Sequence, residues 1–402
     1  MAVEVSLDTL FSALVLIVVI SSLFAFIYPA AYGPLTVTSE HELETVAKTV
    51  LDKILLTPGY PSGWGADILL NLSTMTSFGL AKEGAHSPFE LDLDKVMRLA
   101  NSSEFPFPAT LSLSPTAVAR LLGLRSEERY GFMITITPAL NITASLLSTF
   151  TLAPGYSVGS VFDIQVLNYA RRPAANAEVT VLSILTVVTC GQTADISMIN
   201  SSSSSAIADW SGRCTIDITD WLTIIKNELT GKELKKSTIS IVVFAENAGI
   251  KAAKVFDFDL GSRLSGSSLG NYIFICLEED QPPYGAAHVI NATEALVLPH
   301  YVLTGYLINE TKGQSGLVVN AGSKKYRVYR TSITLTDEVS VAFVVAKSLG
   351  KYFSIPSPRP PDRIQFGTGQ PSAMKTSVQT RIVKIGALHY LFELAVWREG
   401  ES

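Results

Sequence analysis

Residues 130–147 read YGFMITITPALNITASLL, and apolar side chains fall on alternate positions over much of the stretch. A period of two is typical of a β-strand that buries one face. Further β-branched runs follow, separated by turn residues and without long helical patterns between them. These runs are SVFDIQVLN (160–168), AEVTVLSILTVVTC (177–190), CTIDI (214–218) and STISIVVFAE (237–246). The spacing predicts an antiparallel β-sandwich over residues 129–262, in a protein that is mainly β.

The chain after this region is again rich in strand patterns. A Gly/Ser-rich connector at 261–271 leads into YIFICL (272–277), and KKYRVYR (324–330) lies farther on. The chain ends on RIVKIGALHYLFELAVWRE (381–399), whose alternating apolar positions predict a core strand. We therefore expect a β-rich C-terminal domain over residues 263–402.

The residues before the sandwich have a helical period. SEHELETVAKTVLDKILL (39–56) carries an apolar stripe that runs from Leu43 to Leu55, and Ser39 with Glu42 matches a capping box. Shorter amphipathic stretches lie at 91–100 and at 114–124, the second opened by Ser114-Pro115. These patterns predict a small helical, membrane-proximal region over residues 36–128.

The first 35 residues predict a transmembrane helix. Leu10–Tyr28 reads LFSALVLIVVISSLFAFIY without a charged residue, and about 19 helical residues are enough to cross a bilayer. The acidic n-region, MAVEVSLD, and the length of the apolar run favour a retained anchor over a cleaved signal peptide. We expect a single-pass cell-membrane protein with a short cytoplasmic N-terminus and a body outside the cytoplasm.

Composition limits the classes of function. The 402 residues are 47% hydrophobic and 17% charged, with a net charge of -5. A chain this apolar can bury enough surface to fold, so global disorder is excluded. A weakly acidic chain has no overall positive field for nucleic acid, which we do not expect as a partner.

Six Asn-x-Ser/Thr sequons are candidate glycosylation sites, whereas roughly two would arise by chance in such a composition. They lie at Asn71, Asn101, Asn141, Asn200, Asn291 and Asn309. This excess favours an exported body. The alternative explanation is that a Ser/Thr-rich exported chain accumulates sequons passively, and it also implies export.

Two of the three cysteines form a candidate disulfide. Cys190 and Cys214 flank the polar insert GQTADISMINSSSSSAIADWSGR, and a bond between them would tie two strand ends across a loop. The alternative is that both are reduced, like Cys276, which lies in an apolar run and is interpreted as a buried thiol.

The sequence carries no catalytic signature. It lacks the nucleophile elbow, the phosphate-binding loop and the Cys/His spacing of a zinc site, so we predict no enzyme activity, no cofactor and no metal. Two alternatives stay open. The tryptophans, Trp64, Trp210, Trp221 and Trp397, are either core anchors or platforms of a sugar- or ligand-binding module. Scattered carboxylates would serve an extracytoplasmic hydrolase if two of them shared a cleft.

Two stretches carry a resemblance to known families. Glu4 beside an apolar helix, followed by LLTPGYPSGWG (55–65), FGLA (78–81) and LDLDKVMRLA (91–100), resembles archaeal type IV pilin-like, membrane-anchored exported proteins. In that family the helix packs in a filament core and the glutamate neutralises a neighbour's terminal amine. LNYARRPAANAEVTV (167–181) is similar to a strand-turn-strand pattern of bacterial immunoglobulin-like adhesin modules, with Arg171-Arg172 at the usual turn glycine.

Together these features predict a glycosylated surface protein with immunoglobulin-like sandwich units. Its expected role is structural or adhesive, as a pilin-like filament subunit, and Glu4 is the residue that the resemblance assigns to helix assembly. The expected partners are membrane lipid and either further copies of the chain or other envelope proteins.

Overall fold

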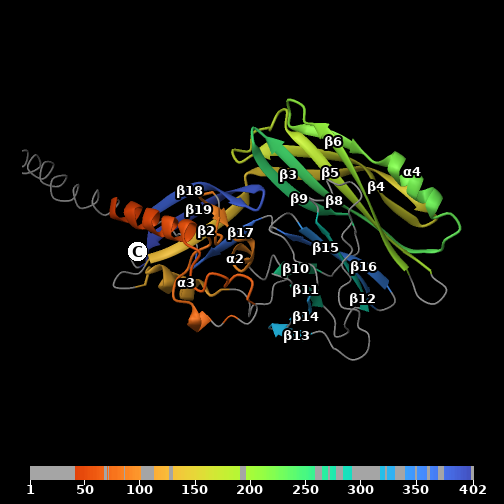
Figure 1. Ribbon diagram of the computed structural model, residues 1–402. Helices are drawn as coiled ribbons and strands as arrows, with labels where there is room; N and C mark the ends of the chain where they lie inside the picture. The colour runs from red at the N-terminus through yellow and green to blue at the C-terminus, as the bar shows by residue number, and fades with distance from the viewer. Residues whose placement is uncertain are drawn as a thin grey trace, which may run out of the picture.

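A computed structural model gives the structure of the protein (Figure 1). It describes residues 41–67, 70, 72–85, 87–100, 113–125, 130–190, 196–258, 265–269, 272–277, 284–291, 317–321, 324–330, 340–348, 351–359, 363–369 and 375–399. The described residues are mainly in strands, and every strand pair except β1 with β18 is antiparallel. The mainly β fold class is therefore confirmed.

Helices form where the sequence predicts them in the N-terminal part. Residues 41–56 are helical. Two shorter helices, α2 (Leu93–Met97) and α3 (Pro115–Leu122), and the 3-10 helix η1 (Leu72–Thr74) follow. Proline occupies the first position of α3, and Gly123 ends it with a φ of 83°, a conformation that glycine adopts without strain. The apolar stripe of helix 41–56 is buried at Leu43, Ala47, Val50, Leu51, Ile54 and Leu55.

Helix 41–56 packs against a sheet of five strands (Figure 1). In order across the sheet these are β1 (Glu90–Leu91), β18 (Thr376–Ile385), β19 (Leu388–Arg398), β2 (Tyr130–Pro138) and β17 (Ile364–Gly367). Strand β19 is central, and Phe392, Leu394 and Val396 on it are fully buried. The prediction that residues 381–399 end in a core strand is confirmed.

The packing corrects the predicted domain boundaries. The last strand, β19, pairs with β2 along the whole length of β2, from Tyr390 opposite Pro138 to Arg398 opposite Tyr130. One hydrophobic core holds these strands together with helix 41–56, α2 and α3. The predicted regions 36–128 and 263–402 are therefore not separate units, because the end of the chain completes the core that its first helices begin.

Residues 140–258 build two packed sheets. The first contains β3 (Leu140–Ala153), β4 (Tyr156–Asn168) and β7 (Arg213–Asp217). The second contains β6 (Ile196–Ile207), β5 (Glu178–Thr189), β8 (Leu234–Asn247) and β9 (Ile250–Asp257), in that order. A second core fills the space between them, and α4 (Thr219–Glu228) covers one part of it with Leu222 and Ile225. The predicted sandwich region thus forms antiparallel sheets that face each other.

Strand β5 is buried on both faces. Val181 and Leu185 belong to the core inside the two sheets, whereas Leu182 and Ile184 belong to the core on the outer face. Because successive side chains of a strand point to opposite faces, a strand covered on both sides reads as the continuous apolar run VLSILTVV rather than as an alternating one.

The serine-rich insert is a strand and not the loop that its composition predicts. Strand β6 contains all five consecutive serines and pairs with β5 from Ile196 opposite Thr189 to Ile207 opposite Glu178, without a register shift. It lies at the edge of its sheet. A polar edge strand can be stable because the backbone ladder needs no apolar side chains and the hydroxyls stay in contact with water.

This strand also excludes the predicted Cys190–Cys214 disulfide, and neither cysteine is in a disulfide. Cys190 directly follows β5, and its backbone N donates to Glu233 O (2.9 Å). Cys214 lies in β7, opposite Ile164. Between the two cysteines the chain returns along β5 as β6. Cys190 therefore lies at one end of the β5–β6 pair, and Cys214 follows the other end. Twelve residues of strand span roughly 40 Å, far beyond the reach of a disulfide.

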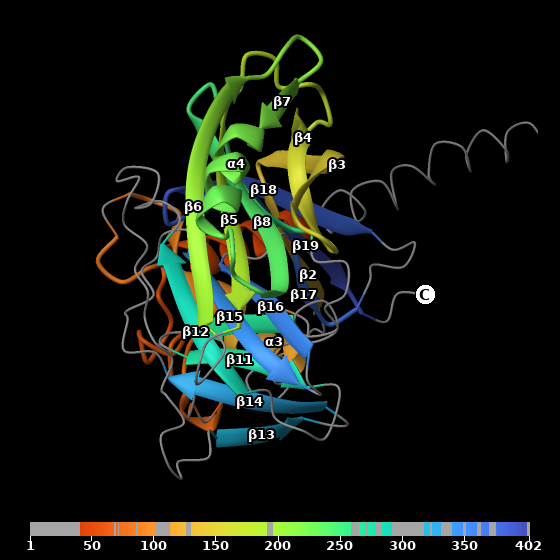
Figure 2. The same ribbon diagram turned by 90° about the vertical axis from the view of Figure 1, so that its right-hand side faces the viewer.

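The remaining strands form two further sheets, which Figure 2 shows below the sandwich. One contains β10 (Ser265–Leu269), β11 (Tyr272–Leu277), β14 (Lys324–Arg330) and β13 (Leu317–Ala321). The other contains β12 (Tyr284–Asn291), β15 (Ser340–Ser348) and β16 (Lys351–Arg359). The C-terminal region is β-rich as predicted, but its strands are distributed over three sheets.

Candidate interaction sites

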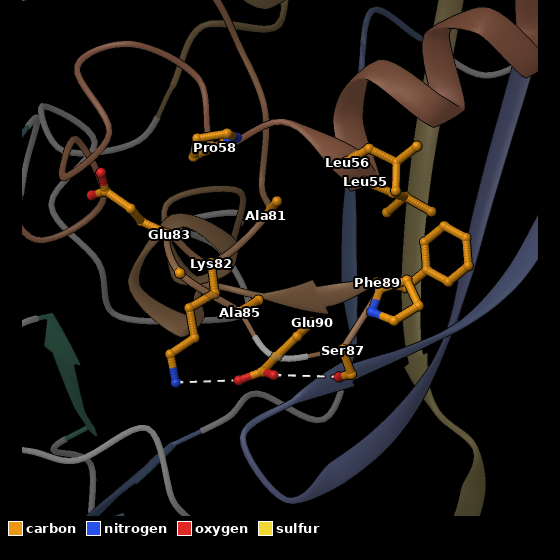
Figure 3. A pocket seen from close by; sticks show the side chains of 12 residues that line it. Leu55, Leu56, Pro58, Ala81, Lys82, Glu83, Ala85, Ser87, Phe89 and Glu90 are labelled. Carbon is orange, nitrogen blue, oxygen red and sulfur yellow. Dashed lines mark hydrogen bonds and ion pairs between the residues drawn. The ribbon is translucent and has the colours of Figure 1, made fainter.

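A hollow in the described surface lies where helix 41–56 ends. Its volume is about 390 Å³. The apolar side chains of Leu55, Leu56 and Phe89 lie beside one another on one side of it, and Pro58 lies apart from them (Figure 3). Leu56 is 54% exposed. The hollow therefore offers an apolar wall that water reaches.

An ion pair forms the opposite side of this hollow. Lys82 Nζ lies 3.3 Å from Glu90 Oε1, and Ser87 Oγ donates to Glu90 Oε2 over 3.4 Å (Figure 3). The backbone N of Lys82 also donates to Glu90 O (2.9 Å), which sets the two side chains beside each other. Sequence reasoning missed this pair, because an intervening turn without any periodic pattern separates the two residues.

Two buried cations, Lys95 and Arg98, bind backbone carbonyl groups of the N-terminal part, and one acceptor, Ala81, lines the hollow. Lys95 Nζ donates to Ala81 O (2.9 Å), and Arg98 Nε donates to Gly65 O (2.7 Å). Arg98 Nη2 also donates to Asp67 O. Burial lowers the pKa of Lys95, with Asp92 and Glu83 opposing the shift, and burial lowers the pKa of Arg98 to about 10. Both side chains are buried, so their charged groups bind backbone carbonyl groups and are not accessible to a ligand.

The hollow lacks the parts of a hydrolytic site in its described lining. Ser87 and Glu90 are present, but no histidine or cysteine accompanies them among the described lining residues. A serine nucleophile needs a base that accepts its proton and a group that orients the base. The arrangement suits noncovalent binding of a group that is apolar at one end and polar at the other.

Metal and thiol chemistry find no support in the described part of the chain. There, no three His, Cys, Asp or Glu residues lie close enough together to hold a metal ion. Cys214 is buried, and burial followed by the charges of Asp163 and Asp209 raises the pKa of its thiol to about 11. A thiol with so high a pKa stays protonated at neutral pH and is a poor nucleophile.

The predicted glycosylation sites are only partly described. Asn141 is exposed on β3, and Asn200 is half-buried on β6. Asn291 is the last residue of β12. The other candidates lie outside the described residues, as does Glu4; they are Asn71, Asn101 and Asn309.

The four tryptophans separate into two groups. Trp64 and Trp397 are core residues, 0% and 5% exposed, and Trp221 packs against the sandwich core. Trp210 is 86% exposed. A tryptophan with so much surface in water contributes little to a core, so Trp210 is the one among them that can act as a binding platform.

Comparison of the chain with protein-family models and with curated protein sequences found no match. Within the described residues, no helix is both long enough and apolar enough to cross a membrane. The predicted span at Leu10–Tyr28 lies outside them. What the structure defines is the class of fold, a mainly β protein with antiparallel sheets.

Proposed function

We propose that this protein is a single-span cell-surface protein with an extracytoplasmic, glycosylated body, and that it serves as a structural or adhesive subunit of a pilin-like filament. Residues 140–258 are the immunoglobulin-like module of this proposal. Two antiparallel sheets that enclose one core support that assignment.

The observation that carries the proposal is the docking of helix 41–56. This helix follows the uncharged stretch Leu10–Tyr28 in the sequence, and its apolar stripe is buried in the same core as β2 and β19. At its N-terminal end, Arg398 Nη2 donates to Glu42 Oε2 (2.7 Å), so the last strand holds the first described turn of the helix. The folded body is thus fixed to the segment that leads from the apolar stretch, as anchoring or filament assembly requires.

Glu4 gives the proposal its sharpest test. The resemblance to pilins assigns this carboxylate to a neighbour's terminal amine, an interaction that Glu4→Ala removes. We expect Glu4→Ala to abolish filaments in sheared material from the native host, as seen by electron microscopy. Asp8→Ala is the matched control, because it removes an acidic residue from the same n-region and should leave filaments intact. Normal filaments from Glu4→Ala would contradict the pilin-like role.

Topology is tested separately. Protease added to intact cells should cleave the C-terminal part of the chain, and mass spectrometry should find glycans on Asn141, whose side chain is exposed. Protection of the C-terminus in intact cells would contradict the extracytoplasmic body.

A second candidate function is a membrane-anchored module that binds a sugar or another ligand. The exposure of Trp210 favours it. This function is compatible with adhesion, because an adhesive subunit needs a surface that recognises its target.

A further inference from the structure

Two turns of the sandwich have the same construction. One is Asn168–Arg172, after β4, and the other is Asp209–Arg213, between β6 and β7; we call them the twin turns. In each, the backbone N of the first residue donates to the carbonyl O of the fifth, over 2.8 Å. The backbone N of the fourth residue donates to the carbonyl O of the first, over 2.8 Å in one turn and 2.9 Å in the other.

The side chain of the first residue fixes both turns in the same way. Asn168 Oδ1 accepts the backbone N–H groups of the third and fifth residues, each over 3.0 Å. Asp209 Oδ1 accepts the equivalent pair over 2.8 and 3.0 Å. The fourth residue has a left-handed φ in each turn, 58° at Arg171 and 74° at Gly212. The twin turns are therefore rigid, because each has the same four hydrogen bonds within five residues, and in the second turn Ser211 Oγ adds a fifth to Asp209 Oδ1 (2.7 Å).

Each twin turn presents an aromatic residue at its second position. Tyr169 is 61% exposed and Trp210 is 86% exposed. A free aromatic ring would gain by packing onto the protein, but the rigid turns hold both rings in water. Ile207, which is 69% exposed, lies just before the second turn.

The two turns lie next to each other. The backbone N of Val166, just before the first turn, donates to Gly212 O of the second (2.8 Å). A Cβ on Gly212 would meet Val166 O and Pro173, so the turns approach as closely as glycine permits. The twin turns therefore lie side by side at one end of the sandwich, and each carries an exposed aromatic residue.

The charge of this surface is positive beside the first aromatic residue. Arg171 and Arg172 are both exposed. The third arginine, Arg213, is paired with Asp163 over 2.9 Å, and Asp209 adds one carboxylate in the second turn, beside Trp210. The guanidinium groups of these two exposed arginines follow Tyr169 in the same turn, and such groups bind carboxylate and sulfate in bidentate fashion.

We propose that the twin turns bind an acidic carbohydrate chain. The apolar C–H face of a sugar ring stacks on the face of an aromatic ring, while hydroxyls at its edge stay hydrated or find polar partners. Two aromatic residues on separate turns suit successive sugars of a chain better than a single sugar. Arg171 and Arg172 then pair with the carboxylate or sulfate groups of the same chain.

A bilayer surface fits these residues less well. Trp210 lies between Asp209 and Ser211, and hydrogen bonds from Arg213 N and Ser211 lower the pKa of Asp209, which keeps this carboxylate ionised. Inserting Trp210 among acyl chains would bring an ionised carboxylate toward hydrocarbon, which is costly. Stacking on a sugar leaves Asp209 in water. The acidic groups of the chain then lie at the sugars next to Arg171 and Arg172 and away from Asp209, so the unit on Trp210 is the one without a charge.

This inference deepens the adhesive part of the proposed function, because it names the chemical class of the target. Its test does not depend on filaments: failure of sugar binding would leave the Glu4 result unchanged, and loss of filaments would leave sugar binding unchanged.

The test uses the full chain in phosphatidylcholine nanodiscs, titrated with oligogalacturonate, a hyaluronan oligosaccharide and a heparin oligosaccharide. Tryptophan emission is the readout, because Trp210 is far more exposed than Trp64 or Trp397. We expect at least one acidic oligosaccharide to shift the emission and to bind, by calorimetry, at least tenfold more tightly than neutral maltoheptaose.

Variants assign the binding to the twin turns. Trp210→Ala and Tyr169→Ala should each weaken binding at least tenfold by calorimetry, and Arg171→Gln with Arg172→Gln should remove the preference for acidic over neutral chains. Tyr60→Ala is the matched control, since Tyr60 is 64% exposed on a different part of the surface. The proposal is overturned if none of the three oligosaccharides binds, if Trp210→Ala binds like the original chain, or if only phosphatidylglycerol vesicles shift the emission.

Discussion

The backbone N of Lys251 donates a hydrogen bond to Nδ1 of His389 over 3.1 Å. Lys251 lies in β9 of the sandwich, and His389 lies at the start of β19 in the sheet that supports helix 41–56. On the other side, the backbone O of His389 accepts from Ala139 N (2.9 Å), where the chain passes from β2 to β3. His389 therefore links the two cores, and the link requires an unprotonated Nδ1.

This link predicts that stability depends on pH. Burial, followed by the charge of Lys384, lowers the pKa of His389, while Glu246 opposes the shift. The unfolded chain then binds more protons than the folded chain below pH about 6.5, so the free energy of unfolding rises with pH through that window. The contribution of neutral His389 to stability is complete above about pH 6.5 and is lost as the pH falls through the lowered pKa of His389.

His389→Gln is the matched variant for this prediction, because a glutamine amide accepts the same hydrogen bond and does not titrate. Urea denaturation at about pH 5 and about pH 8 should show a larger loss of stability on acidification for the original chain than for His389→Gln. Amide exchange at Lys251 should accelerate at the lower pH in the original chain alone. Equal losses in both chains would show that His389 is not responsible.

The elements predicted correctly are those in which one face decides burial. The stripe from Leu43 to Leu55 and the alternation after Tyr130 each follow from a single buried side, which period and apolarity record directly. Local patterns therefore identified most described elements before β10.

The features that sequence patterns did not predict depend on strand pairing between distant residues or on backbone conformation. The serines of β6 indicate a loop by composition, and only pairing with β5 makes them a strand. The pairing of β19 with β2 joins sequence ends that no local pattern relates. The fourth residue of each twin turn has a left-handed φ. Glycine at position 212 indicates this conformation in the sequence, whereas arginine at position 171 does not.

Gly131 and Trp397 are opposite each other in β2 and β19, and this pairing predicts a sensitive position. A Cβ on Gly131 would overlap the indole ring of Trp397, which is buried. We expect Gly131→Ala to lower the free energy of unfolding by about 1–3 kcal/mol, the usual cost of overpacking a core. Gly63→Ala is the control, since no atom lies within 4 Å of a Cβ built there. Equal denaturation midpoints for the two variants would contradict the prediction.

Arg98 predicts a second sensitive position. Its guanidinium group is buried and donates to the carbonyl O atoms of Gly65 and Asp67. Arg98→Met keeps the aliphatic length but leaves two acceptors without a charged donor, which should cost about 2–4 kcal/mol. Arg120→Met, on the exposed face of α3, should change stability by less than about 0.5 kcal/mol. Urea denaturation followed by circular dichroism measures both, and similar effects would show that the Arg98 contacts are not stabilising.

Ser183 provides the opposite case, a substitution that should stabilise the protein. Its side chain is fully buried in β5, and within the described structure its Oγ has no hydrogen-bond partner. A hydroxyl that loses its water without gaining a partner costs about 1–3 kcal/mol, whereas Ser183→Ala removes only one heavy atom from a packed site. We expect Ser183→Ala to raise the denaturation midpoint, by about 1 kcal/mol in the free energy of unfolding. Ser203→Ala, on exposed β6, should leave it unchanged. A loss of stability in Ser183→Ala would mean that the hydroxyl has a partner, such as a buried water, that stabilises the sandwich core.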